Sequence, residues 1–325
     1  MLPKIKKEFQ QLHSSIETLV AKQEKSQAID YANALKDIKG ALANLYEHYE
    51  VDGQISWLEL TQYNLLTEFQ DEITAKVLSL NETVSNDIVR FLGDVFNIAT
   101  TEAANAFQKE TNRVLSSSAV RIEVLEKSVQ NPMSGLTLNE RFEKKRTKVV
   151  FKMKEEITQG LYRNETYATM AKRVTEVLEG DAYKAETIVR TEAHRVREEA
   201  VYQQASAFKD DGIVLTKTWN TVGDERVRPQ HVKMDGKTIP VDEDFVMPDG
   251  TKGPGPGMMG APQHDIRDRC FLTYEVVDIQ EPGTVNKNSS IELPNGTEAQ
   301  TNTSKTQAPE PKQPIKIEDR FTRVK

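Results

Sequence analysis

The sequence predicts an α+β protein that is predominantly α-helical, with an elongated helical N-terminal region, a smaller domain of helices and short strands, and a disordered polar tail. Apolar residues recur at steps of three and four through most of the first 208 residues, which places an apolar stripe along each helix. After Gly212 they alternate with polar residues, as in strands, and from about Glu281 large apolar residues become rare. We therefore expect a helical arm over 1–130, a mixed domain over 136–280 and a tail over 281–325.

The N-terminal region is expected to contain three or four long helices joined by short turns. Helical spacing is found over residues 5–19, 35–49, 57–80 and 83–127. Gly40 interrupts the second of these segments without necessarily breaking it. Leu58 is one of the residues expected in the core of the third, and "VDGQISW" (51–57) predicts the turn before it. Long helices joined by short turns are typical of a bundle or stalk.

The second domain is expected to begin after "NPMSG" (131–135), a run of turn-forming residues. Thr137 and Glu140 have the spacing of a capping box at a helix start. Helices are then expected as far as residue 160, over 166–178 and over 182–208. Strands are predicted at 213–220, 237–240 and 270–278. Glycine and proline in the loop 248–263 exclude helix and central strand there.

The composition limits the classes of protein to which this chain can belong. The net charge is −7, so contact with DNA would have to come from a local basic patch. Cys270 is the single cysteine, which excludes an intramolecular disulfide and fits a reducing compartment. The N-terminus lacks a signal-peptide core, and no apolar run approaches a membrane span. We expect a soluble protein that is made in a cytoplasm and has no membrane partner.

A basic face is expected on the helix that follows Thr137. Its residues, separated by steps of four, three and four, are Arg141, Lys145, Lys148 and Lys152. They are the first candidates for contact with DNA phosphates. Charge runs are also common on exposed helices without a ligand, and neighbouring glutamates partly neutralise this one, so we favour a solvated face.

Charged residues gather on the helix around residue 192 and in "DERVRPQHVKMDG" (224–236). Arginine and carboxylate groups in this density favour an ion-pair network, because a guanidinium matches two carboxylate oxygens. The alternative is an acid/base or metal-dependent enzyme, such as a hydrolase or a toxin-like protein, that uses Arg190, Glu192, Asp224 and His231. The sequence has neither a strained nucleophile turn nor a phosphate loop, so we expect no catalytic residue.

A metal site would draw on His231, His264 and Cys270, with Asp268 or Asp235 as a further ligand. These residue types suit zinc. The sequence has none of the short paired spacings of cysteine or histidine that are usual in structural zinc sites. We therefore expect no metal and no cofactor, and keep the two histidines and the cysteine as weak candidates.

Residues 136–277 resemble the phage Mu F-like minor head proteins, the family of the SPP1 gene 7 product. The matching pieces follow in the family's order: "RTE" (190–192), Trp219, "DERVRPQH" (224–231), "MDG" (234–236) and a Gly/Pro loop. Where the family ends in Asn-Cys-Arg-Cys, this chain has "RDRC" (267–270), so Asp268 stands at the first cysteine. A site with two thiols is therefore not available here.

The resemblance implies a minor capsid protein of the virion that lies near the portal, at few copies per head. It implies a role in head morphogenesis, DNA packaging or DNA ejection, with the portal protein and other head components as partners. Sequence-independent contact with double-stranded DNA is one means by which it would act. The implied location is the phage head, after assembly in the host cytoplasm. No catalytic chemistry is established by the family pattern.

The family motif implies a structural role for its residues in this chain. They are Arg190, Thr191, Glu192, Trp219, Asp224, Arg226, Arg228, His231, Asp235, Gly236 and Cys270. We expect the charged residues of 224–235 to pair with Arg190 and Glu192, and so to fix a small α+β domain and its partner-facing loop.

Overall fold

The computed structural model describes residues 4–62, 64–113 and 136–280. Most of these residues lie in four long helices: α1 (Lys4–Tyr49), α3 (Leu65–Thr111), α5 (Leu138–Tyr162) and α6 (Tyr167–Asp210). With a small sheet after them, this confirms the predicted class, predominantly α with short strands. The expected boundary at 131–135 and the tail at 281–325 lie outside the described residues. The division at residues 130 and 136 stays a prediction.

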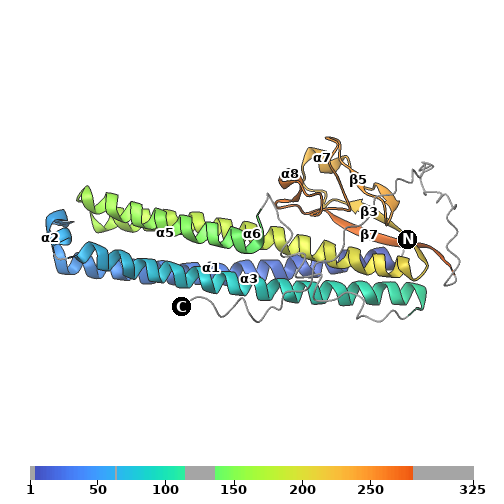
Figure 1. Ribbon diagram of the computed structural model, residues 1–325, viewed down its shortest axis with the longest axis horizontal. Helices are drawn as coiled ribbons and strands as arrows, with labels where there is room; N and C mark the ends of the chain where they lie inside the picture. The colour runs from blue at the N-terminus through green and yellow to red at the C-terminus, as the bar shows by residue number, and fades with distance from the viewer. Residues whose placement is uncertain (1–3, 63, 114–135, 281–325) are drawn as a thin grey trace, which may run out of the picture. The chain divides into compact units, whose positions relative to one another are not determined.

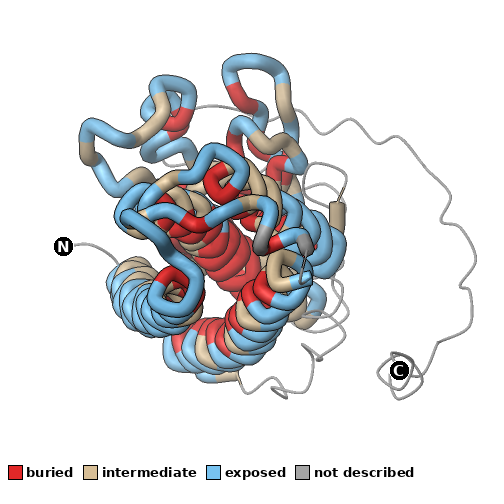
Figure 2. The backbone as a smooth tube through the Cα atoms, turned by 90° about the vertical axis from the view of Figure 1, so that its left-hand side faces the viewer, coloured by how far each residue is buried: buried red, intermediate tan, exposed pale blue. Residues whose placement is uncertain are grey.

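The four long helices lie side by side, and the strands lie against one end of α6 (Figure 1). Buried residues line their facing sides and form one apolar core (Figure 2). An aromatic group joins helices to sheet: the ring of Phe107 lies 5.3 Å from Phe9, 4.9 Å from Phe208 and 5.8 Å from Tyr274. Among the described helices, none combines the length and apolar character needed to cross a bilayer.

Helix α1 is one helix of 46 residues, so the prediction of two separate segments is wrong. The apolar stripe continues through the polar middle by way of Val20, Gln27 and Tyr31, which are all buried. Gly40 lies within the helix with open space where a side chain would stand, and costs only about 1 kcal/mol relative to alanine. Three widely spaced buried residues are too few to see as a stripe in sequence.

Helices α3 and α6 also differ from the predicted segments. Helix α6 runs unbroken through Gly180, where two helices were expected. The segment expected to begin at Trp57 contains a short helix, α2 (Trp57–Gln62), and then α3, which continues without a break past residue 80. Leu58 on α2 is 70% exposed, so its expected place in the core is wrong.

Two local signals in the sequence are confirmed. Asp52 and Gly53 both have positive φ (52° and 78°) and join the two-residue strands β1 (Glu50–Val51) and β2 (Gln54–Ile55) into a tight hairpin. The capping box is present at α5, because Glu140 N–H donates to Thr137 Oγ1 (3.3 Å) and Thr137 N–H donates to Glu140 Oε2 (2.7 Å). Both depend on a few neighbouring residues, which is why sequence reveals them.

The sheet has β3 (Ile213–Asn220) between β4 (Thr238–Pro240) and β7 (Phe271–Ile279), with both pairs antiparallel. Strand β5 (Phe245–Val246) pairs with β6 (Lys252–Gly253), and two four-residue helices, α7 (Pro229–Val232) and α8 (Pro262–Asp265), lie in the connections. The exclusion of helix from the loop 248–263 is wrong at its end, because Pro262 takes the first position of α8, where its missing N–H is harmless.

Candidate functional site

The residues of the predicted basic face do not share an exposed surface. Lys145 is buried (7% exposed) because it stands in the apolar stripe of α5, between Phe142 and Val149. Its Nζ donates to three side chains of other helices: Tyr31 Oη (2.9 Å), Asn81 Oδ1 (2.8 Å) and Asp181 Oδ2 (2.7 Å). Lys145 therefore ties together the four long helices and is not available to a phosphate.

The other members of that face are placed differently from one another. Arg141 binds Glu192 of α6 at 2.5 Å. Lys152 pairs with two glutamates on its own helix, Glu155 (2.8 Å) and Glu156 (2.7 Å). Lys148 is exposed. Basic residues at steps of four, three and four therefore lie on a stripe of α5 that is partly buried and partly exposed. Their charge alone does not reveal this.

Helix α6 holds two buried carboxylates, each bound to arginine. Glu192 is fully buried between Arg141 and Arg195, with the Arg195 contact at 2.7 Å. Glu198 pairs with Arg197 at 2.7 Å and accepts the Leu272 backbone N–H at 3.1 Å, which fastens α6 to β7. These carboxylates stabilise the contacts of α6 with α5 and β7. Both oxygens of each carboxylate are already bound, which leaves neither available for acid/base chemistry.

The stretch "DERVRPQHVKMDG" is bound mainly to the segment just before β7. Asp224 accepts two hydrogen bonds from Arg269 (2.6 and 2.5 Å), which lower the pKa of the Asp224 carboxyl to about 2. Arg228 donates to the carbonyl oxygens of His264 (3.4 Å) and Ile266. Asp235 accepts the Thr221 N–H at 2.7 Å. A scaffold role fits these contacts.

The expected pairing with Arg190 and Glu192 is not what the structure has. Arg190 binds Glu24 of α1, and Thr191 accepts the Arg267 N–H at 3.1 Å. Arg190, Glu192, Asp224 and His231, which the enzyme interpretation groups together, take part in four separate sets of interactions. Gly236, with φ of +74°, donates its N–H to Trp219 O at 2.8 Å and so turns the chain back toward β3.

A buried cluster of His231, Asp268 and Cys270 lies beneath this stretch, called here the His–Asp–Cys cluster. His231 Nδ1 is 3.2 Å from Asp268 Oδ1 and 3.3 Å from Cys270 Sγ. One potential ligand atom from each residue lies within 4.8 Å of the other two. The rings of Trp219 and His231 are nearly perpendicular (86°), with centroids 5.5 Å apart. The side chains come from α7 and from "RDRC", so the fold unites them across 37 residues.

A chain of contacts continues from His231 to the surface. His231 Nε2 lies 3.2 Å from His264 Nδ1, and His264 Nε2 lies 2.8 Å from Asp249 Oδ2. A backbone hydrogen bond from Thr251, followed by His264, lowers the pKa of Asp249 to about 2. The weak metal candidate His264 is thus a neighbour of His231, one contact removed from the cluster.

Asp268 is the centre of the cluster. Its Oδ1 accepts the backbone N–H groups of Arg269 (2.7 Å) and Cys270 (3.1 Å). Burial opposes its ionisation, but the neighbouring His194 and His231 outweigh burial and hold the pKa of the carboxyl well below its usual range. Burial, and then the Asp268 carboxylate, raise the pKa of the Cys270 thiol. An anionic carboxylate thus lies beside a thiol.

An arginine-lined pocket of about 560 Å³ opens above Asp268, and we call it the arginine pocket. It is lined by Glu17, Val20, Glu186, Arg190, Arg226, Arg228, Arg267, Asp268 and Arg269. Five of these nine residues are arginines, although the whole chain is acidic. The Arg226 side chain is 79% exposed. Guanidinium groups in a concave site suit phosphate or carboxylate oxygens.

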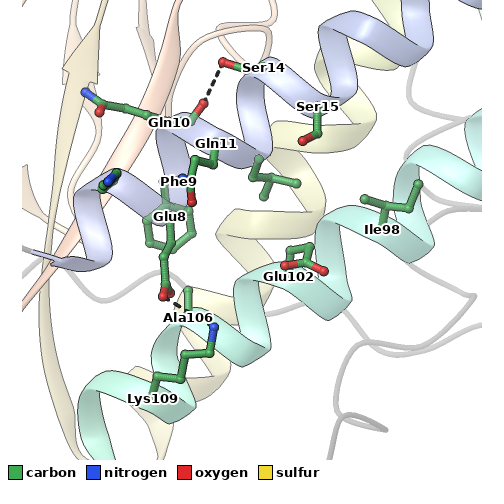
Figure 3. Close-up of a pocket in the computed structure, with 12 residues that line it drawn as sticks. Glu8, Phe9, Gln10, Gln11, Ser14, Ser15, Ile98, Glu102, Ala106 and Lys109 are labelled. Carbon is green, nitrogen blue, oxygen red and sulfur yellow. Dashed lines mark hydrogen bonds and ion pairs between the residues drawn. The ribbon is translucent and has the colours of Figure 1, made fainter.

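A second hollow, of about 800 Å³, lies between α1 and α3. Figure 3 shows Glu8 and Lys109 pointing toward one another across it, with Nζ and Oε1 3.4 Å apart. Its other lining consists of Lys7, Glu102 and a mixture of glutamine, serine and apolar side chains. Among the described residues, the candidate metal-ligating cluster lies elsewhere, at His231, Asp268 and Cys270.

Comparison with known proteins identifies the family of this chain. A family model described as "Phage Mu protein F like protein" matches residues 151–273, which include α6, strands β3 and β4, the start of β7 and the His–Asp–Cys cluster. "Minor head protein GP7" of Bacillus phage SPP1 is 30% identical over 274 residues, which cover 84% of this chain and 88% of that protein. The chain belongs to the phage Mu F-like family of minor head proteins.

A second relative carries a different name. "NAD(+)--arginine ADP-ribosyltransferase EFV" of Enterococcus faecalis is 29% identical to this Mu F-like protein over 264 residues. These residues cover 81% of this chain but 53% of that protein, so the chain spans about half of that relative's length. No solved structure matches this chain.

Several residues of the site in this Mu F-like protein lie outside the motif positions that sequence singled out. Arg267 and Arg269 supply the pocket, His194 faces Asp268, and Asp249 ends the histidine chain. Arg267 and Arg269 flank Asp268 in "RDRC", and this density of charge beside the cysteine is the sequence feature that could have indicated their role. Asp249 lies in a glycine-rich turn, where an aspartate is ordinary, and carries no signal.

Proposed function

We propose that the chain is a minor component of a phage head, that it associates with the portal, and that it assists head morphogenesis, DNA packaging or DNA ejection. The carrying observation is the similarity to a minor head protein over nearly the full length of both chains. A match of that extent includes the long helices as well as the motif domain. The buried, arginine-bound carboxylates favour a structural protein over an enzyme.

The far end of the helices is the proposed contact with a head partner. Around α2, which lies at the opposite end from the strands (Figure 1), large apolar side chains are exposed: Val51 (71%), Leu58 (70%) and Tyr162 (68%). Trp57 of α2 packs against Tyr162 of α5, so α2 and Tyr162 belong to one surface. Exposed apolar surface of this kind is typical of protein contacts.

Introduction of lysine at exposed apolar residues of this tip is expected to weaken binding to the portal protein. The change is Leu58→Lys with Tyr162→Lys, and both side chains are more than two-thirds exposed, so the fold should persist. We expect the double variant to lose at least about tenfold in affinity, since fully buried apolar contacts contribute about 1.5–3 kcal/mol each. The measurement is co-purification with co-expressed portal protein. Ile29→Lys, which alters a 54% exposed residue of α1, is the matched control. Equal capture of all three proteins would remove the tip from the proposal.

We propose further that DNA phosphates are contacted in the arginine pocket rather than along α5. The pocket brings together arginines from α6, from the 226–228 turn and from "RDRC", whereas the face of α5 loses Lys145 to the core. Phosphate contacts of this kind fix position and carry no base sequence. They also make affinity fall with salt, because bound counterions are released.

Removal of one exposed pocket arginine, Arg226→Ala, is expected to weaken DNA binding and reduce its salt dependence. The slope of log K against log salt should become less steep by roughly one unit for each phosphate that the protein no longer binds. The measurement is a fluorescence anisotropy titration with a random-sequence duplex at several salt concentrations. Arg90→Ala on α3 is the matched control, because its side chain is 75% exposed. An identical slope for wild type and both variants would exclude this contact, and so would a reduction of the slope by Lys148→Ala alone.

A further inference from the structure

We propose that the His–Asp–Cys cluster binds one zinc ion, with His231 Nδ1, the Asp268 carboxylate and the Cys270 thiolate as ligands. This site is independent of the proposed head function. It has no recognisable sequence motif, because His231 is far along the chain from Asp268 and Cys270, and because Asp268 stands where the family pattern has a cysteine.

The geometry of the three ligand atoms suits a single tetrahedral ion. Zinc bonds of about 2.0–2.3 Å hold neighbouring nitrogen, oxygen and sulfur ligands roughly 3.3–3.7 Å apart. The distances from His231 Nδ1 are 3.2 Å to Asp268 Oδ1 and 3.3 Å to Cys270 Sγ. The ligand atoms of Asp268 and Cys270 lie within 4.8 Å of one another, so these two side chains would draw together as the ion binds.

The hydrogen bonds around His231 leave a lone pair directed into the cluster. The Asp249 carboxylate only accepts, so the short contact with His264 takes the proton of His264 Nε2. His264 Nδ1 must then accept from His231 Nε2, at 3.2 Å. When the ring is neutral, His231 Nδ1 has no proton, and its lone pair faces Asp268 and Cys270 as a ligand for a cation. A metal-bound histidine whose other nitrogen donates along a chain to a carboxylate has the usual outer shell of a zinc site.

Asp268 also has a buried oxygen without a hydrogen bond. Within the described residues Asp268 Oδ2 accepts none, although it is fully enclosed. His194 Nε2 lies 3.6 Å away, beyond hydrogen-bond range. His194 Nδ1 accepts from Arg197, which can only donate, so His194 Nε2 carries its proton and orients the carboxylate instead of acting as a ligand. Asp268 thus enters the cluster as an anion, with Oδ1 facing His231 Nδ1 and Oδ2 facing His194 Nε2.

The charges balance when zinc is bound. One Zn²⁺ with the Asp268 carboxylate and the Cys270 thiolate is neutral, and a neutral complex is the form that a buried site tolerates. The thiol gives up its proton to solvent as the zinc–sulfur bond forms, so binding releases one proton. Three protein ligands leave the fourth position to water.

The test uses full-length protein stripped with a chelator and then loaded with Zn²⁺ or Co²⁺. We expect one zinc per chain by elemental analysis after dialysis, and a rise in Tm of at least about 5 °C. Bound Co²⁺ should show a thiolate charge-transfer band and the visible bands of a tetrahedral ion. Cys270→Ser should remove the thiolate band, and His231→Gln should abolish retention of zinc, whereas His48→Gln on exposed α1 should change neither.

The spectrum of the wild-type protein makes the test independent of whether variants fold. Failure to retain zinc, or a cobalt spectrum without a thiolate band, overturns the proposal. Undiminished retention by folded His231→Gln protein, with circular dichroism as the check of folding, also overturns it.

Discussion

Asp181→Ala is expected to lower the free energy of unfolding by about 3–5 kcal/mol, because it leaves the buried Lys145 ammonium without its counter-charge. The pair is 2.7 Å apart, with 5% and 1% of the two side chains exposed. Burial lowers the pKa of Lys145, opposed by Asp181. Without Asp181 the folded state holds the proton less tightly than the unfolded chain, so stability should rise with pH. Urea denaturation at pH 7 and pH 9.5 measures both effects.

Two comparisons separate charge from packing in this result. Adding Lys145→Met to Asp181→Ala removes the stranded charge and should recover part of the loss. Glu176→Ala, which removes an exposed partner of Lys172 at 3.9 Å, should cost less than about 0.5 kcal/mol. If the double variant is no more stable than Asp181→Ala alone, the buried ammonium is not the cause.

Trp219→Ala is expected to cost about 3–5 kcal/mol, the range for removing a large buried aromatic side chain. Trp219 is fully buried in β3, and its ring contacts His231 (5.5 Å) and Phe245 (5.4 Å). Its loss should also release His231, so the variant should lose zinc together with stability. Thermal melts followed by circular dichroism measure the first effect.

The chain's other tryptophan is the matched control for this experiment. Trp57 is partly exposed on α2, where it packs against Tyr162. Trp57→Ala should lower Tm much less and leave the His–Asp–Cys cluster intact. Equal shifts for the two variants would mean that Trp219 is not part of the core that supports the cluster.

Local features of the fold could be predicted from sequence, and distant ones could not. The capping box at Thr137, the Asp52–Gly53 turn and the strand at 213–220 each depend on a few adjacent residues. The continuity of α1 depends on Gln27 and Tyr31, polar residues that are buried against other helices, and the partners of Tyr31 are Asp181 of α6 and Lys145 of α5. Lys145 was misplaced for the same reason, since its partners lie 36 to 114 residues away.

The site divides in the same way. The arginine and carboxylate content of 224–236 indicated a network, and a network is present. Its partners were predicted wrongly, because the sequence cannot show that residues 224–231 lie beside "RDRC" (267–270) in the fold. Asp224 binds Arg269, and His231 contacts Asp268. The lack of short paired spacings does not exclude a ligand set that the fold assembles from two loops.

The central claim is that the chain is a minor head protein held at the portal, and a count of its copies in purified heads tests this most directly. Heads would be assembled from the phage's own structural proteins with and without the portal protein, purified, and analysed by quantitative mass spectrometry. We predict a few copies per head when the portal is present and essentially none when it is omitted. Absence from portal-containing heads, or equal amounts in both preparations, would contradict the claim.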